Sequence, residues 1–99
     1  MKYYVYILLT VDNTYYTGIA TDVLRRFEEH KTSIKGAKYT KSHPPREIVY
    51  IKEFQDKSSA SKEEYRIKKT LTKKQKTALI EENSTETAIL IEKLINQQK

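Results

Sequence analysis

Residues 3–19 constrain the fold of this chain most, because their pattern predicts a β-hairpin. Residues 3–9 are rich in Tyr, Val, Ile and Leu, and the run is too short for a helix of that composition. Asp12-Asn13 supplies turn chemistry, since both residue types tolerate left-handed backbone, and residues 14–19 return to strand-forming residues. The hairpin places Tyr6 and Tyr16 in opposite strands.

The rest of the chain predicts helices around one further strand. Thr21 or Asp22 is a favourable N-cap for a helix to about Lys31, and residues 32–46 suit a loop with a short helical turn. A third strand is predicted over Glu47–Phe54, and three helices follow it. The first is capped by Ser58-Ser59 and ends near Lys69, and the second is capped by Thr72 and ends near Glu82. The third covers residues 84–97, and its apolar stripe consists of Ala88, Ile91, Leu94 and Ile95. The order ββ-α-β-α-α-α predicts an α+β fold, in which helices flank a small three-stranded antiparallel sheet.

The length of 99 residues leaves room for one hydrophobic core. We expect residues 1–83 to form the domain and residues 84–99 to pack on it as a helical extension. The alternative is that this last segment is a helix for a partner protein, since it combines zero net charge with an apolar stripe.

Several classes of protein are excluded or disfavoured by composition. The chain has no cysteine, which excludes disulfides and thiolate metal sites and fits a reducing compartment. The apolar run at the N-terminus is too short to span a membrane and lacks a signal-peptide cleavage site. With Gly18 and Gly36 as its two glycines, the chain has no glycine-rich phosphate loop for a small-molecule cofactor. We therefore expect a cytoplasmic monomer with no membrane partner.

The net charge of +6 is concentrated in two stretches that contain no acidic residue. The first runs from Lys31 to Arg46 and the second from Arg66 to Lys76. Such stretches can follow the phosphate backbone of a nucleic acid, although a solvated lysine-rich surface is an equal alternative. The candidate nucleic-acid-binding residues are Lys35, Lys38, Lys41, Arg46, Lys68 and Lys69.

Helical periodicity places three polar residues beside apolar ones. In the first helix, Arg26 and His30 lie one turn apart at the edge of the apolar face, while Arg25 lies on the far side. In the second helix, Glu64 lies within the apolar stripe and Glu63 lies outside it. A carboxylate in that position is costly unless a cation, a metal ion or hydrogen bonds compensate it. A snorkelling arginine and a structural salt bridge are the alternatives to catalytic roles for Arg26 and Glu64.

These residues lie in segments that resemble the GIY-YIG nuclease superfamily, in particular its small single-domain bacterial branch. Tyr4-Val5-Tyr6 and Tyr16-Thr17-Gly18 resemble the two motifs that name the superfamily, and Arg26 stands where its catalytic arginine does. The segment from Glu64 to Lys69 is similar to the one carrying the metal-binding glutamate, and Gly36–Thr40 to a stretch found in the small bacterial branch.

The resemblance implies a metal-dependent endonuclease that hydrolyses nucleic-acid phosphodiester bonds, with DNA as substrate and DNA repair as one setting. It implies that Tyr16 or Tyr6 helps to activate the attacking water, that Arg26 stabilises the transition state, and that His30 assists proton transfer. Glu64 is the implied ligand of one Mg²⁺ or Mn²⁺ ion.

Two departures from the family pattern support an alternative, a non-catalytic nucleic-acid-binding module with the same fold. Tyr4 replaces the glycine that opens the first motif, and Ile19 replaces a lysine found in some relatives. In either case contact with nucleic acid depends on the basic stretches, so binding is expected to be salt-sensitive. Tyr39 and His43 are candidates for stacking on an unpaired base, with internal packing as the alternative role.

Overall fold

A three-stranded antiparallel sheet forms the centre of the computed structural model, which describes residues 1–32 and 38–98. Its strands are β1 (Tyr3–Thr10), β2 (Tyr15–Ala20) and β3 (Pro45–Phe54), in the order β2-β1-β3. The hairpin turn contains Asn13 with a φ of 62°, the left-handed conformation that its side chain tolerates. The predicted α+β fold with a three-stranded antiparallel sheet is therefore confirmed.

Five helices are present in the described residues: α1 (Val23–Thr32), α2 (Lys38–Ser42), α3 (Lys57–Thr70), α4 (Lys73–Glu82) and α5 (Ser84–Gln97). The predicted cap of α4 is confirmed, because Thr72 and Gln75 form a reciprocal capping box. The predicted cap of α3 is wrong. Asp56 caps this helix by accepting a hydrogen bond from the Ser59 backbone N–H at 2.7 Å, so Ser58 and Ser59 lie inside the first turn.

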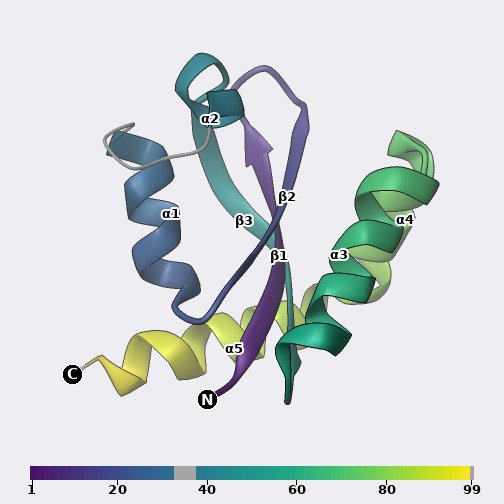
Figure 1. Ribbon diagram of the computed structural model, residues 1–99. Helices are drawn as coiled ribbons and strands as arrows, with labels where there is room; N and C mark the ends of the chain where they lie inside the picture. Colours follow the sequence, from purple (N-terminus) through teal and green to yellow (C-terminus); the bar gives the residue numbers. More distant parts are fainter. Residues whose placement is uncertain (33–37, 99) are drawn as a thin grey trace.

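The helices cover both faces of the sheet, and the alternation of side chains along β1 supplies a core to each (Figure 1). Tyr4, Tyr6 and Leu8 point to the face covered by α1 and α5. Val5 and Ile7 point to the opposite face, where they pack with Ala60 and Ile67 of α3, and Leu79 and Ile80 of α4 pack against the same cluster. Both faces of β1 are therefore buried, which explains its nearly continuous apolar sequence.

Helix α5 lies across β3, and its buried stripe differs from the predicted one. The stripe consists of Thr87, Leu90, Ile91 and Leu94, whereas the predicted members Ala88 and Ile95 are exposed. The reason is a backbone requirement of the sheet. The Ile51 N–H donates to Thr87 Oγ1 at 3.3 Å, so the helix presents its threonine to the strand.

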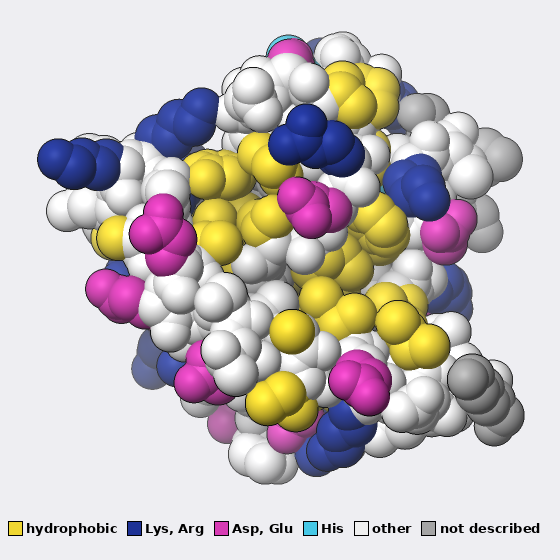
Figure 2. Space-filling view, turned by 180° about the vertical axis from the view of Figure 1, so that it is seen from behind, with side chains coloured by type: hydrophobic (Ala, Val, Ile, Leu, Met, Phe, Trp, Pro, Cys, Tyr) yellow, Lys and Arg dark blue, Asp and Glu magenta, His cyan; other side chains and the backbone are white. Residues whose placement is uncertain are grey.

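The face of the molecule opposite the view of Figure 1 carries many hydrophobic side chains near its centre. Figure 2 shows hydrophobic side chains gathered in a band across this face, with Lys and Arg mostly towards its periphery. None of the described helices is both long and apolar enough to cross a membrane.

Candidate active site

The centre of the candidate site is the Tyr6 side chain, which lies across Gly18 of the neighbouring strand. Tyr6 and Gly18 are direct partners in the antiparallel register. A Cβ atom at position 18 would lie 2.5 Å from Tyr6 Oη and 2.6 Å from Tyr6 Cζ, which is closer than real Cβ atoms approach. The glycine of the Tyr16-Thr17-Gly18 motif is therefore required by the close approach of a tyrosine ring rather than by a turn.

His30 of α1 lies within hydrogen-bonding distance of the Tyr6 hydroxyl and is completely buried. Its Nε2 lies 3.0 Å from Tyr6 Oη and its Nδ1 lies 2.7 Å from Thr40 Oγ1. Burial, with a smaller effect of the Arg26 charge, lowers the pKa of His30 to about 4. The neutral imidazole thus donates to one hydroxyl and accepts from the other.

Arg26 and Tyr16 complete the side of the site that faces α1. The Tyr16 ring lies 4.9 Å from the His30 ring and 6.4 Å from the Tyr6 ring, measured between centroids. Arg26 Nη1 donates to Glu29 Oε1 at 3.0 Å, and its guanidinium lies close enough to both phenols to lower their pKa values. Burial outweighs this effect, so the pKa of each phenol is raised and both remain protonated at neutral pH.

Glu64 approaches the same two phenols from α3. Its negative charge raises the pKa of Tyr6 and of Tyr16, although burial has the larger effect. The Glu64 side chain is 22% exposed, and its ion-pair partner among the described residues is Lys68, with Nζ 3.8 Å from Oε2. Glu63 turns elsewhere and binds Arg66 through two hydrogen bonds of 2.8 Å. The carboxylate on the apolar stripe is thus neither sealed in the core nor neutralised by a close salt bridge.

A groove of about 360 Å³ opens beside Tyr16. Its lining includes Tyr15, Tyr16 and Tyr39 and the ammonium-bearing residues Lys68, Lys69 and Lys76. A second hollow of about 270 Å³ borders Arg26 and Glu29 on the other side of the site. Tyr16 and Arg26 therefore each line a concavity that solvent can enter, whereas Tyr6 and His30 are buried behind them.

The predicted basic residues are placed differently relative to this groove. Lys68 and Lys69 line it, and Lys38 lines an adjoining hollow with Tyr39, Ser42 and His43. Lys41 and Arg46 are exposed but line neither cavity, and Lys35 lies outside the described residues. The sequence interpretation did not select Lys76 or Thr40. Lys76 ends the second basic stretch, and that concentration of charge could have suggested it, whereas no pattern along the chain pairs Thr40 with His30.

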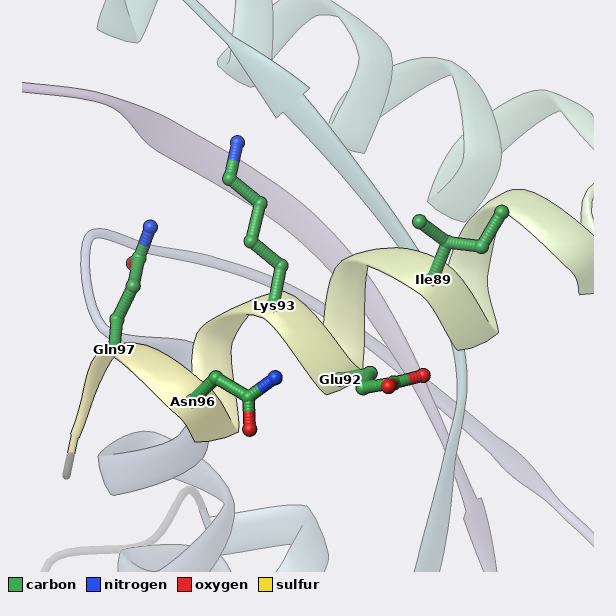
Figure 3. A pocket seen from close by; sticks show the side chains of 5 residues that line it. All are labelled: Ile89, Glu92, Lys93, Asn96 and Gln97. Carbon is green, nitrogen blue, oxygen red and sulfur yellow. The ribbon is translucent and has the colours of Figure 1, made fainter.

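Two further cavities are less suited to chemistry. A groove of about 470 Å³ lies along α5 (Figure 3). Its lining side chains come from this one helix: Ile89, Glu92, Lys93, Asn96 and Gln97. A cavity of about 230 Å³ between the α1 N-terminus and the end of α5 is lined in part by Tyr4 and Asp22. Within residues 1–32 and 38–98, no three His, Asp or Glu side chains gather as they would around a fully protein-bound metal ion.

The chain has clear relatives of known sequence and structure. Residues 2–78 match the family model described as the GIY-YIG catalytic domain. A UPF0213 protein of Oceanobacillus iheyensis is 46% identical over 80 residues, which cover 81% of this chain and 91% of the relative. The UPF0213 protein YhbQ of Salmonella typhimurium is 42% identical over 88 residues, 89% of this chain and 86% of the relative.

A solved structure agrees with these sequence comparisons. The solution NMR structure of a UPF0213 protein from Bacillus halodurans is 40% identical in sequence and superimposes with a TM-score of 0.56. The match covers 85% of this chain and 87% of that one. The domain match, the sequence relatives and the shared fold agree, and the chain belongs to the GIY-YIG family, among its small UPF0213 proteins.

Proposed function

We propose that this protein is a metal-dependent endonuclease that hydrolyses phosphodiester bonds in nucleic acid, with DNA as its substrate. The observation that carries the proposal is the convergence of four residues from four different elements, with Arg26 and Glu64 both close to the phenols of Tyr6 and Tyr16. Tyr16 lines an open groove and Arg26 lines a second hollow. An arginine, two phenols and one partly exposed carboxylate are a suitable set for phosphoryl chemistry.

Glu64 is the residue that would hold a divalent ion. A single, partly exposed carboxylate suits Mg²⁺ or Mn²⁺, because such ions retain water and complete their coordination with substrate phosphates. When bound, the ion supplies Lewis acidity and lowers the pKa of a coordinated water. The Lys68 ammonium competes with it for Glu64, so affinity for the ion is expected to be low until nucleic acid binds.

The remaining roles follow from burial and hydrogen bonding. Arg26 is oriented by Glu29 and donates to the phosphate oxygens as negative charge grows on them. Tyr16 is protonated and half-buried, so it orients the attacking water by hydrogen bonding and does not begin as a phenolate. His30 has no exposed surface, which makes it a positioning residue that holds the Tyr6 hydroxyl in place.

A non-catalytic nucleic-acid-binding module is the second candidate function. The observation that favours it is the position of Lys68, whose Nζ lies 3.8 Å from Glu64 Oε2 and 6.0 Å from the centre of the Tyr16 ring. In such a protein this ammonium would remain on the carboxylate and no divalent ion would be needed.

The deciding experiment compares Glu64→Gln with Glu63→Gln, its neighbour on α3. Cleavage of duplex and single-stranded DNA is measured with Mg²⁺ or Mn²⁺ and again with EDTA. We expect Glu64→Gln to lose at least about 100-fold in rate, as removal of a metal ligand should. Glu63→Gln should retain activity, because its carboxylate is occupied by Arg66. Both variants should melt near the wild-type temperature.

Two results would decide against hydrolysis. One is a wild-type protein that binds DNA with a steep salt dependence but cleaves no substrate with either ion, which selects the binding module. The other is cleavage that persists equally in EDTA and in Glu64→Gln, which would trace the activity to a contaminant.

A further inference from the structure

The groove beside Tyr16 has two chemically different walls. The tyrosine wall is the set of lining rings of Tyr15, Tyr16 and Tyr39, and the lysine wall is the set of lining side chains of Lys68, Lys69 and Lys76. The two sets adjoin, since Lys68 Nζ lies 6.0 Å from the centre of the Tyr16 ring. A ligand that fits both walls needs a flat π-face and a negative charge a short distance away. A nucleotide has this combination, since its base stacks on aromatic rings and its phosphate pairs with ammonium groups.

The tyrosine wall continues outward as a series of stacked rings. The Tyr16 and Tyr39 rings are 6.1 Å apart and tilted by 24°, and the Tyr39 and His43 rings are 4.3 Å apart with the same tilt. Tyr39 is 37% exposed and also lines the adjoining hollow formed with Lys38 and Ser42. The rings therefore lead from the candidate active site to the surface.

The outermost ring is held by a hydrogen-bond chain, so the series is preorganised. His43 Nδ1 donates to Asp12 Oδ2 at 2.6 Å, and the Thr10 hydroxyl donates to Asp12 Oδ1 at 2.6 Å. These contacts lower the pKa of Asp12 to about 2, with the Thr10 hydroxyl as the larger cause. A ring fixed before binding loses little conformational entropy when a ligand stacks on it.

We infer that this groove and the Tyr39–His43 ring pair bind an unpaired nucleobase, while the lysine wall holds the adjoining phosphates. The inference rests on the proposed function in taking nucleic acid as the ligand, and it adds that the substrate has unpaired nucleotides beside the bond to be cut. Bases within a duplex are stacked on each other, so their faces are not available to Tyr39. An acidic peptide would satisfy the lysines but would leave the tyrosine faces without a partner.

The test measures binding without metal, so it does not depend on cleavage. Fluorescence anisotropy in EDTA compares an oligothymidylate of about eight nucleotides with an abasic backbone of the same length. Wild-type protein should bind the base-bearing strand about 10-fold more tightly, within the range expected for stacking on an aromatic ring. Tyr39→Ala should reduce that ratio to about one, and Tyr39→Phe should preserve it because the ring remains.

Matched variants separate the two walls. Tyr65→Ala removes a tyrosine that is 64% exposed on α3 outside the groove, and it should leave the ratio unchanged. Lys76→Ala should weaken the binding of both strands equally and leave the ratio intact, because phosphate contacts do not sense the base. Melting curves establish that each variant is folded.

The inference is overturned if the wild type binds the two strands equally, if Tyr39→Ala keeps the full ratio, or if a duplex binds as tightly as the single strand. It is also overturned if an oligoglutamate peptide of equal charge competes as well as the oligothymidylate. None of these outcomes affects the Glu64→Gln cleavage test, and a protein that does not cleave can still pass the binding test.

Discussion

His30 and Thr40 are polar residues that the fold buries completely, at 0% exposure each. Each of the two His30 ring nitrogens lies within hydrogen-bonding distance of a hydroxyl, so the cost of burying the ring is met by partners. The ring aligns Tyr6, and Tyr6 in turn requires Gly18. At the scale of single residues, the position of each buried group in the site therefore depends on the next, from Thr40 through His30 and Tyr6 to Gly18.

The buried state of His30 predicts a loss of stability in mild acid. Its folded pKa of about 4 lies below the ordinary value of 6.5, so the unfolded chain binds the proton more readily. The neutral His30 makes its full contribution to the free energy of unfolding above pH 6.5. This contribution decreases as the pH falls from 6.5 towards 4, by at most about 2.5 kcal/mol between pH 7 and 4.5. Urea unfolding at the two pH values measures it.

The matched control for this prediction is the second histidine. His30→Gln removes the titration and should flatten the pH dependence relative to wild type, whereas His43→Gln leaves the buried imidazole and its two hydroxyl partners in place. Wild type and His30→Gln carry the same carboxylates, so the difference between them isolates His30. If the free energy of unfolding changed equally with pH in wild type and in His30→Gln, the assignment of a buried neutral imidazole would be contradicted.

Arg26 and Arg25 provide a second residue-scale comparison. Arg26→Lys should lower the cleavage rate by about 100-fold, because a lysine ammonium cannot reproduce the planar fork that reaches Glu29 and both phenols. Arg25→Lys should change it less than about twofold, since Arg25 is 73% exposed and pairs weakly with Glu29 at 3.4 Å. Single-turnover kinetics at saturating protein measure both. Similar losses in the two variants would show that position 26 has no special role.

At the scale of elements, adjacent residues acquire different roles from the geometry of their helix or strand. On α3, Glu63 and Glu64 are one residue apart, and the helical twist sends one to Arg66 and the other to the phenols. On β1, alternation sends Tyr6 to the site and its neighbours Val5 and Ile7 to the opposite core. The pairing of β1 with β2 then places the Tyr6 ring over Gly18.

Gly18→Ala tests this strand pairing. The added methyl would lie 2.6 Å from Tyr6 Cζ, and the resulting overpacking should cost about 1–3 kcal/mol in unfolding free energy. The cost should persist in a Tyr6→Phe background, which keeps the ring, and should fall in Tyr6→Leu, which removes it. A double-mutant cycle from denaturant unfolding gives the coupling. An equal cost in all three backgrounds would mean that the ring is not the reason for the glycine.

At the scale of the whole molecule, the site depends on elements from both faces of the sheet. Tyr6 and Tyr16 come from the sheet, Arg26 and His30 from α1 on one face, and Glu64 from α3 on the other (Figure 1). Helix α5 stabilises the assembly away from the site by packing Leu90, Ile91 and Leu94 against the Tyr6 cluster. We propose that residues 84–99 act as a packed extension of the domain formed by residues 1–83.

Removal of residues 84–99 tests that proposal. Three half-buried side chains contribute about 3–6 kcal/mol together, which is comparable with the total stability of a small domain. The truncated chain should therefore unfold or aggregate, as followed by circular dichroism and light scattering. Ile89→Ser and Ile95→Ser, both at exposed positions on α5, should remain monomeric with nearly unchanged melting temperatures. A truncated chain that melts normally would identify α5 as a helix for a partner protein.

The sequence alone was sufficient for features that depend on nearby residues. These include the hairpin with its turn at Asn13, the Thr72 cap, and the separation of Glu64 from Glu63 on α3, all of which follow from turn chemistry and periodicity. Family resemblance added the grouping of Tyr6, Tyr16, Arg26 and Glu64. Each of these features depends either on residues that are close in the sequence or on a motif whose residues have a fixed spacing.

The tertiary structure decided what depends on distant residues. It placed Thr40 against His30, brought the Tyr39 ring within 6.1 Å of the Tyr16 ring and 4.3 Å of the His43 ring, and brought Lys76 to the groove. It also turned α5 so that Thr87 meets the Ile51 N–H, a rotation that hydrophobic periodicity did not predict. The physical reason is that packing and the need to satisfy buried polar groups are set by whichever elements meet in space, and no local pattern encodes those meetings.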